Sequence, residues 1–438
     1  MYLNKYINVS NNVELFLSYK RSFLIKKYET KYSLNDDGAI LVREFDGRKT
    51  LEEIIKNILK RDINNIRDEE MNYINSFLTH LEKFGFVEFS ALPKYRTFNI
   101  KGNLDTVIPL IVTLELTNKC NFKCRYCYND CEIDNDRFIS NPLEILKYLH
   151  RIGSHGIELS GGEPFLHPRI SEILEYLVDH FDIFAILTNG ALIKKQHLDI
   201  LKRKSENKRI AIQICLDGSN EENVDLTAGV KGAFKNIINA IKLVKYYSLP
   251  LRVGMVIDHP DKINDIESTL LLSRELGADL FIASPMYDIG RGQVMATNFT
   301  KNDNMRLLKE IYRLHKKYKG FFQTMKERLS IENTENCGAG SKNIAIDWDG
   351  IIHPCPVANY NLNLGKWNEI LTDKTQYKMK KFVSLNHPDI KECEGCKYLL
   401  YCSGCTTKGI LKFIKLKEKC LWYQKNQKIL DDLLEINL

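Results

Sequence analysis

The feature that most constrains the fold is a regular alternation of short apolar runs and amphipathic segments between residues 107 and 292. The apolar runs have the length and the β-branched content of buried strands, and the segments between them have helical spacing. Six such alternations predict parallel strands joined by helical crossovers, arranged either as an open partial barrel or as a doubly wound sheet. The expected strands are LIVTLEL, GIELS, IFAIL, IAIQICL, LRVGMVI and LFIAS.

Unusual turn sequences follow five of these strands. TNKCNFKCRYC follows the first strand, GGEP the second, TNG the third, LDGS the fourth and YDIGRG the sixth. In barrel-like α/β folds, the C-terminal ends of the strands form the working face. We therefore expect these segments, which are far apart in the chain, to meet at one mouth.

The flanking segments predict further units. Residues 1–90 predict a small unit of three strands and three helices, in which Thr50 and Glu53 have the spacing of a capping box. The stretch from Asp68 to Lys83 has helical apolar spacing and is followed by Gly85 as a stop. The remaining divisions are a linker at 91–106, the α/β unit at 107–300, a bridging helical region at 301–336, and a cysteine-rich unit at 337–438 with a hairpin around Asp349 and Gly350.

Composition bears on the compartment and on the cysteines. No apolar run approaches the ~18 residues of a membrane span, and the first residues, MYLNKYINVSNN, lack the pattern of a signal peptide. We therefore expect a cytoplasmic protein, in which disulfides rarely persist, so that the twelve cysteines point to metal or redox chemistry. The net charge of +7 is spread along the chain and is typical of a solvated surface.

The first cysteine loop places Cys120, Cys124 and Cys127 at C-x3-C-x2-C spacing. Three thiolates can hold three irons of a [4Fe–4S] cluster and leave the fourth iron open to a reactant, whereas a structural zinc site needs four protein ligands. Cys131 could supply a fourth thiolate by spacing, so spacing alone leaves the open site and the closed site as alternatives.

The loop resembles the signature of the radical S-adenosylmethionine (radical SAM) superfamily, with Tyr126 in its aromatic position. SGGEP and TNG resemble two further motifs of that superfamily. The resemblance implies a partial (β/α)6 barrel in which the open iron chelates S-adenosylmethionine, and reductive cleavage yields a 5′-deoxyadenosyl radical. The residues that it assigns to binding S-adenosylmethionine are Tyr126, Ser160, Gly161, Gly162, Glu163, Thr188 and Asn189.

The fourth strand departs from the superfamily pattern. Relatives usually have serine at the position of Cys215, and histidine and arginine at those of Val224 and Ala228. We expect Cys215 to be a small buried side chain and leave it, with Cys131, off the set of ligands.

The cysteine-rich tail resembles the SPASM domain, which carries two auxiliary [4Fe–4S] clusters, and so implies three clusters in all. His353 could supply the missing ligand of one cluster, but we expect it to lie at the surface of the hairpin. For the whole tail, the alternative is a zinc ribbon that stabilises the fold. The inner cluster would be held by Cys337, Cys355 and Cys405, and the outer one by Cys393, Cys396, Cys402 and Cys420.

The N-terminal segment resembles the winged-helix RiPP recognition element, which binds the leader of a ribosomally made precursor peptide by strand addition. The resemblance implies leader contacts at Thr30, Lys31 and Tyr32 and on the helix 68–83. At the mouth of the barrel, Arg291 is a candidate anchor for a substrate carboxylate.

The whole organisation resembles the thioether-forming sactipeptide and ranthipeptide maturases. It implies a precursor peptide as substrate and a low-potential electron donor such as flavodoxin or ferredoxin, with no nucleic acid and no membrane span. Two alternatives remain: another radical modification of the peptide, namely a carbon–carbon crosslink or an epimerisation, and a zinc-stabilised winged-helix protein that binds nucleic acid.

Overall fold

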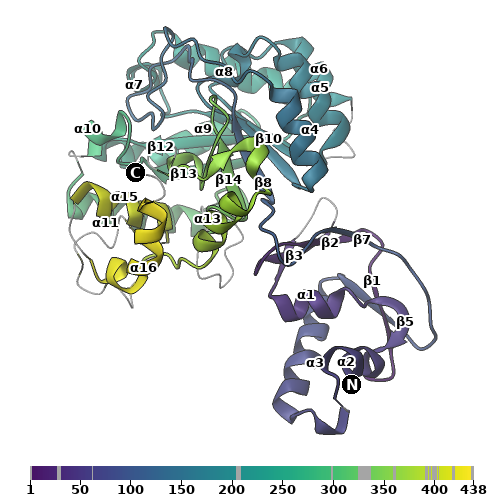
Figure 1. The fold of residues 1–438 in the computed structure, drawn as a ribbon. Helices are drawn as coiled ribbons and strands as arrows, with labels where there is room; N and C mark the ends of the chain where they lie inside the picture. The colour runs from purple at the N-terminus through teal and green to yellow at the C-terminus, as the bar shows by residue number, and fades with distance from the viewer. Residues whose placement is uncertain are drawn as a thin grey trace. The chain divides into compact units, whose positions relative to one another are not determined.

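The computed structural model describes residues 2–26, 31–61, 63–203, 209–296, 299–323, 337–358, 362–389, 393, 396, 402, 404–416 and 420–435. The chain forms two compact units, Met1–Ile108 and Pro109–Leu438 (Figure 1). None of the helices among the described residues is long and apolar enough to cross a membrane.

The described residues of the N-terminal unit form two small sheets and three α-helices. One sheet has the order β5-β1-β6 and the other has the order β4-β3-β2-β7. The helices are α1 (Asp36–Val42), α2 (Leu51–Leu59) and α3 (Asp68–Lys83), with a 3-10 turn at Ile63–Asn65. The strands are β1 (Tyr6–Val9), β2 (Val13–Leu17), β3 (Ser22–Lys26), β4 (Lys31–Leu34), β5 (Asp46–Thr50), β6 (Val87–Ser90) and β7 (Asn99–Gly102).

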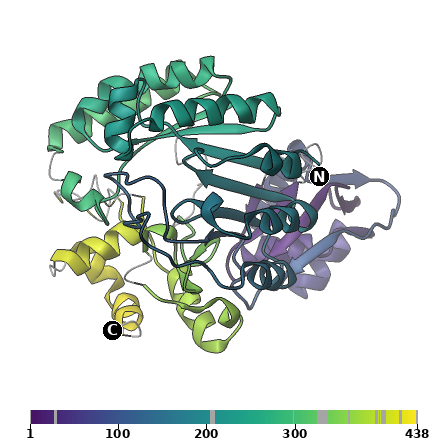
Figure 2. The ribbon, with the colours of Figure 1, turned by 90° about the horizontal axis from the view of Figure 1, so that it is seen from above.

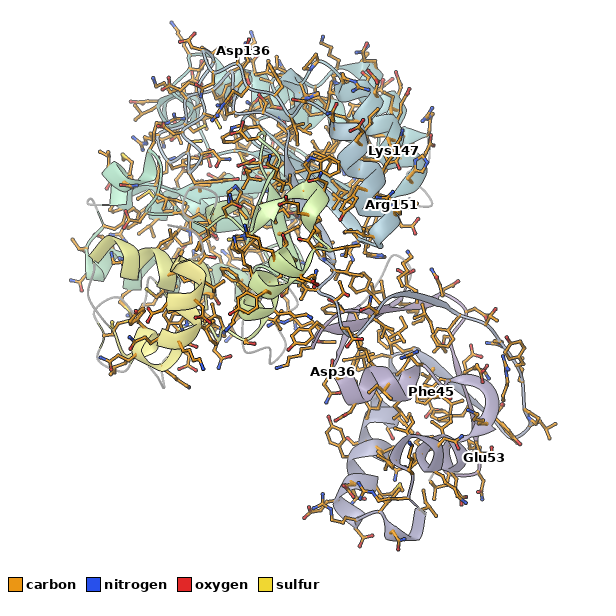
Figure 3. All side chains as sticks on the ribbon, viewed as in Figure 1. Asp36, Phe45, Glu53, Asp136, Lys147 and Arg151 are labelled. Atoms are coloured by element: carbon orange, nitrogen blue, oxygen red, sulfur yellow. The ribbon has the colours of Figure 1, made fainter. Side chains whose placement is uncertain are left out.

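Local signals in this unit are confirmed. The backbone N–H of Thr50 donates to Glu53 Oε2 at 2.7 Å, and the N–H of Glu53 donates to Thr50 Oγ1 at 3.3 Å, which is the capping box at the start of α2. Phe45 lies fully buried in the core between the sheets and the helices, and Figure 3 labels it together with Glu53.

The expected number of strands and the expected linker are wrong. The described part of the unit has seven strands rather than three. Within 91–106, β7 pairs in parallel with β2, from Glu14 opposite Asn99 to Leu17 opposite Gly102. The segment therefore belongs to the N-terminal unit, because its backbone completes a sheet there.

The second unit is built on a nine-stranded sheet with the order β13-β12-β11-β10-β9-β8-β14-β15-β16. Its first six strands in the chain pair in parallel, each with the next. A doubly wound sheet reverses its strand order at a switch point, so the unbroken order identifies the open partial barrel. The six strands are β8 (Ile111–Glu115), β9 (Gly156–Ser160), β10 (Ile183–Thr188), β11 (Arg209–Cys215), β12 (Leu251–Ile257) and β13 (Leu280–Pro285).

Helices between the strands cover the outer side of the curved sheet (Figure 2). Their apolar faces account for much of the core, as in α5, where Ile173, Leu174 and Leu177 are fully buried. The helices are α4 (Pro142–Ile152), α5 (Ile170–His180), α6 (Lys195–Lys202), α7 (Glu221–Ala228), α8 (Ala233–Tyr246), α9 (Ile266–Glu275), α10 (Gly292–Ala296) and α11 (Lys301–Lys317).

The C-terminal part joins the barrel through its own hairpin. The predicted turn is confirmed, since β14 (Asn343–Ile346) and β15 (Ile351–His353) pair antiparallel around Gly350, whose φ is 78°. β14 also pairs in parallel with β8, which the sequence did not indicate. The remaining elements are β16 (Gly365–Lys366), α13 (Asp373–Val383), α15 (Thr406–Leu416) and α16 (Leu421–Glu435).

Candidate active site

The first cysteine loop begins where β8 ends, and the end of α7 fixes its backbone. The N–H groups of Lys123 and Arg125 donate to the carbonyls of Ala228 and Thr227 at 2.8 and 3.1 Å. These carbonyls belong to the last turn of α7, where no further helical N–H is available to them. The loop therefore completes the hydrogen bonding of the helix end, and the helix end positions the loop.

The three loop thiols are half-buried and lie in one region of the structure. Burial raises the pKa of Cys120 to about 12. The pKa of Cys124 lies well above its usual range because of burial, nearby Asp217 and the other two thiols. A hydrogen bond from Cys131 is the main cause that lowers the pKa of Cys127 to about 6. Thiolates suit an iron–sulfur cluster as ligands, and loading the cluster would release the protons that Cys120 and Cys124 carry.

The thiols are not arranged as a finished coordination cage. In the described ranges, no group of three or more His, Cys, Asp or Glu side chains has the geometry of a metal site. What fits the cluster is the chemistry of the donor set: three mutually influencing thiols on one loop at the open end of the barrel.

The glycine turn after β9 packs directly on the start of the cysteine loop. Gly161 has a φ of 115°, and a Cβ there would lie 2.5 Å from the Thr117 carbonyl oxygen. A Cβ on Gly162 would lie 2.0 Å from the carbonyl oxygen of Lys119. The N–H of Gly162 donates to the carbonyl oxygen of Thr117 at 2.6 Å. Both positions require glycine because two backbones meet there.

Glu163 connects the second and third motif turns. Its side chain is 0% exposed, and Oε1 accepts from Thr188 Oγ1 at 2.7 Å while Oε2 accepts from the Asn189 N–H at 2.9 Å. Burial raises its pKa to about 7. Asn189 in turn donates to Asn121 Oδ1 at 2.9 Å. These contacts confirm that the first three turns meet at one mouth.

Two aspartates that the sequence analysis missed hold the other side of the loop. Asp217, after β11, accepts from the Tyr126 hydroxyl at 2.6 Å and from the Val256 N–H at 2.8 Å. Asp258, after β12, forms an ion pair with Arg125. Each aspartate comes directly after an apolar strand, which is the signal that could have found it.

The departures on the fourth strand have a structural counterpart. Val224 and Ala228 are buried in α7, whose terminal carbonyls bind the loop backbone. Cys215 is half-buried, and burial next to Asp217 raises the pKa of its thiol. The thiol is held in its neutral form, but the side chain is only half-buried and not fully buried as expected.

Arg291 does not have the position expected of a carboxylate anchor. Its Nε and Nη2 donate to the carbonyls of Cys124 and Cys131, both at 2.9 Å, and its Nη1 pairs with Asp130 at 2.7 Å. The side chain is only 17% exposed. The guanidinium is thus committed to the cysteine loop, and its role in the structure is to brace that loop.

A buried carboxyl lies beneath the loop at the end of β8. Glu115 Oε1 accepts from Asn129 Nδ2 at 2.8 Å and from the Tyr128 hydroxyl at 3.2 Å. Its Oε2 has no hydrogen-bond partner in the described part of the chain. Burial raises the pKa of Glu115 to about 7.

The tail thiols influence one another in two groups. Burial together with Cys405 and Cys337 raises the pKa of Cys355 to about 12. Burial together with Cys396 and Cys420 raises that of Cys402 to about 12. The Cys396 N–H donates to the Cys393 carbonyl at 3.0 Å. This division has the same members as the two predicted ligand sets, whose assignment to clusters stays a prediction.

His353 is not at the surface, contrary to expectation. It is 3% exposed, with Nε2 at 2.8 Å from Asp347 Oδ2 and Nδ1 at 3.0 Å from the Leu362 carbonyl oxygen. Both ring nitrogens are engaged, which gives His353 a structural role inside the hairpin rather than that of a cluster ligand.

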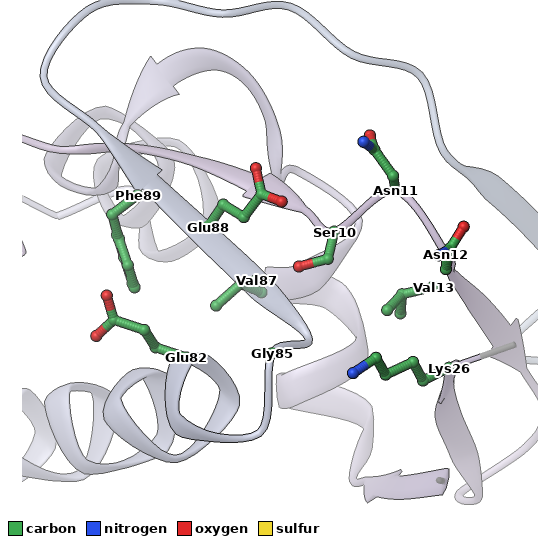
Figure 4. A pocket seen from close by; sticks show the side chains of 10 residues that line it. All are labelled: Ser10, Asn11, Asn12, Val13, Lys26, Glu82, Gly85, Val87, Glu88 and Phe89. Carbon is green, nitrogen blue, oxygen red and sulfur yellow. The ribbon is translucent and has the colours of Figure 1, made fainter. Parts of the chain in front are cut away.

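In the N-terminal unit, β4 is at the edge of its sheet as described. Tyr32 on β4 packs against Phe77 and His80 of α3, with ring centroids 6.1 and 5.4 Å apart. Lys31 belongs to the same strand, and Thr30 lies outside the described residues. An open hollow of about 620 Å³ lies at the end of α3 (Figure 4), lined by residues that include Lys26, Glu82, Glu88 and Phe89.

Two family models match the chain. The radical SAM superfamily matches residues 114–272, and the SPASM iron–sulfur cluster-binding domain matches residues 337–397. The SPASM match contradicts the alternative of a zinc-stabilised tail, because this model describes an iron–sulfur cluster-binding domain.

Individual proteins extend the similarity to nearly the whole chain. The antilisterial bacteriocin subtilosin biosynthesis protein AlbA of Bacillus subtilis is 28% identical over 420 residues, 92% of this chain and 90% of AlbA. The sporulation killing factor maturation protein SkfB of the same organism is 28% identical over 198 residues, 44% of this chain and 46% of SkfB. The crystal structure of Streptococcus suis SuiB bound to S-adenosylmethionine shares the fold, with a TM-score of 0.62, 18% identity, and coverage of 95% and 98% of the two chains. The chain therefore contains a radical SAM domain and a SPASM iron–sulfur cluster-binding domain, and over nearly its whole length it is similar to the subtilosin biosynthesis protein.

Proposed function

We propose that the chain is a radical SAM maturase that installs thioether crosslinks, from cysteine sulfur to carbon, in a ribosomally made precursor peptide. The observation that carries the proposal is the likeness to the subtilosin biosynthesis protein over 92% of the chain. A match of that length has to include most of the N-terminal unit as well as the barrel and the tail.

At the mouth of the barrel, Cys120, Cys124 and Cys127 would hold the cluster that binds S-adenosylmethionine. Bound there and given one electron, S-adenosylmethionine would supply the 5′-deoxyadenosyl radical that takes a hydrogen atom from the peptide. The main chain of Gly161 and Gly162 and the carboxylate of Glu163 would bind the methionine part. Oε1 of Glu163 already accepts from Thr188 and from the Phe165 N–H, so the methionine amine would bind Oε2, which has a second acceptor site beside the one that Asn189 uses.

The two groups of tail thiols would hold two auxiliary clusters, which makes three [4Fe–4S] clusters in all. Seven tail cysteines cannot fill two four-ligand sites. The group of Cys337, Cys355 and Cys405 would therefore leave one position for the cysteine thiolate of the peptide. Electrons would enter from a flavodoxin or ferredoxin.

The leader of the precursor would bind the N-terminal unit by adding a strand to the edge strand β4 at Lys31 and Tyr32, with Thr30, which lies outside the described residues, as the third predicted contact. The packing of Tyr32 on α3 supports this position, because the same helix would contact the leader. The hollow in Figure 4 lies at the end of that helix.

The test uses a candidate precursor, a short cysteine-containing peptide with a leader that binds the N-terminal unit, and a variant of it in which each cysteine is replaced by serine. Under anaerobic conditions with dithionite, the native precursor should lose two hydrogens per crosslink and lose its alkylatable thiols. The serine precursor should keep its mass while S-adenosylmethionine is still cleaved. Normal crosslinking of the serine precursor would rule out a thioether.

The same experiment separates the other radical modifications. A carbon–carbon crosslink also removes two hydrogens but leaves the thiol open to iodoacetamide. An epimerisation leaves the mass unchanged and is detected by chiral amino-acid analysis after hydrolysis.

A further inference from the structure

One residue of α15 contacts both groups of tail thiols. The Lys408 N–H donates to Cys405 Sγ at 3.4 Å, and the Cys402 thiol donates to the Lys408 carbonyl at 4.0 Å. Cys405 belongs to the predicted inner set and Cys402 to the predicted outer set. The backbone of Lys408 is therefore the point at which the two sets meet.

The ammonium group of Lys408 lies in a sheltered place beside the mouth of the barrel. Its Nζ is 4.8 Å from the centroid of the Tyr287 ring, a cation–π distance. Burial lowers the pKa of Lys408, while Cys405, Cys402 and Asp288 act in the opposite direction. Asp288 is itself 3.8 Å from Lys412, one helical turn further along α15.

The segment that carries Tyr287 also touches the first cysteine loop. The Arg291 N–H donates to the Cys127 carbonyl at 3.0 Å, and a Cβ on Gly290 would lie 2.4 Å from the same oxygen. Lys408 thus packs on a segment that joins the loop at the mouth of the barrel to the tail thiols.

We propose that Lys408, whose backbone contacts Cys405 and Cys402, carries a positive charge close to both auxiliary clusters and raises the reduction potential of both. A cluster that takes up one electron gains one negative charge, and a nearby cation in a poorly solvated place stabilises that charge. Lys408 would thereby favour uptake of the electron that the substrate radical releases when the crosslink forms. This inference rests on the proposed assignment of the tail cysteines to two clusters.

The test measures potentials instead of turnover. Cys120, Cys124 and Cys127 are replaced by alanine in the full chain, so that only auxiliary clusters remain, and the reconstituted protein is titrated with dithionite and followed by EPR. Lys408→Met should make one-electron reduction about tenfold less favourable at fixed potential, a shift of about 59 mV to lower potential. Lys408→Arg should stay close to the parent, because it keeps the charge. Lys374→Met removes an exposed lysine of α13 and should leave the potentials unchanged.

The outcomes separate this inference from the proposed function. About eight irons with unshifted potentials in Lys408→Met would overturn the role of Lys408 alone, as would an equal shift in Lys408→Arg. About four irons or fewer in the parent would overturn the cluster assignment and the inference with it. If Lys408→Met fails to hold its clusters, Lys408→Gln provides the same loss of charge with a polar side chain. If Lys408→Met shifts the potentials of the auxiliary clusters but the wild-type enzyme makes no thioether, the role of Lys408 is supported and the proposed product is rejected.

Discussion

Arg291→Ala tests whether this arginine braces the cysteine loop or anchors the substrate. In the structure its guanidinium donates to the carbonyls of Cys124 and Cys131, both at 2.9 Å. Hydrogen bonds from a charged group contribute about 1.5–3 kcal/mol each. The pair with Asp130 adds little, because that carboxylate is 61% exposed. Removal should therefore destabilise the ordered loop by about 3 kcal/mol or more, which is roughly a hundredfold in its population.

The assay is the iron content of the reconstituted protein together with 5′-deoxyadenosine formation in the absence of peptide. Arg291→Ala should lose about four irons and should lose this uncoupled cleavage, because the loop no longer presents its thiols together. Arg291→Lys should recover only part of both, since an ammonium cannot span the two carbonyls. Arg137→Ala is the matched control, because in the described structure the guanidinium of Arg137 contacts the half-exposed Asp349 and the ring of Trp348 rather than the cysteine loop. Full iron content and normal uncoupled cleavage in Arg291→Ala, with crosslinking alone lost, would refute the brace and restore the carboxylate anchor.

Three further predictions concern other parts of the chain. Asp217→Ala removes the partner of the Tyr126 hydroxyl and should weaken binding of S-adenosylmethionine several-fold while the iron content stays unchanged. The affinity is measured from the change in the EPR signal when the cofactor is added, and an unchanged affinity would show that Tyr126 does not contribute to cofactor binding. The pKa of Glu115 is raised to about 7, so its contribution to stability is complete below its ordinary pKa and is lost as the pH rises towards 7. Glu115→Gln should accordingly raise the melting temperature of the cluster-free protein relative to wild type more at pH 7 than at pH 5, and a difference independent of pH would contradict the buried carboxyl. Tyr32→Ala should weaken leader binding at least tenfold in a fluorescence anisotropy titration while iron content stays unchanged, and equal affinity would move the leader site away from β4.

Local signals in the sequence were sufficient for much of the fold. The capping box at Thr50 and Glu53 and the bounds of α3 depend on neighbouring residues, and both are confirmed. The six barrel strands were found because each is a buried apolar run. Their common mouth followed from topology, since parallel strands present the same ends on the same side.

What the sequence did not indicate depends on contacts between distant residues. β7 is four residues long and has a single apolar side chain, so it lacks the alternation of apolar residues by which a strand is recognised in a sequence. It is defined by its backbone pairing with β2. The partners of Arg291 are carbonyls more than 150 positions away, and carbonyls carry no sequence signal. His353 could have been recognised from Asp347, because the hairpin brings these two residues together across its strands.

The pairing of β14 with β8 has a practical consequence for anyone who wishes to study the barrel without the tail. β8 would lose the neighbour that runs from Asn343 opposite Ile111 to Ile346 opposite Leu114. A chain shortened at residue 336 would present the N–H and C=O groups of β8 to solvent, and an uncovered flat strand of this kind invites aggregation. The tail is therefore needed to keep the barrel dispersed in solution, in addition to any metal that it carries.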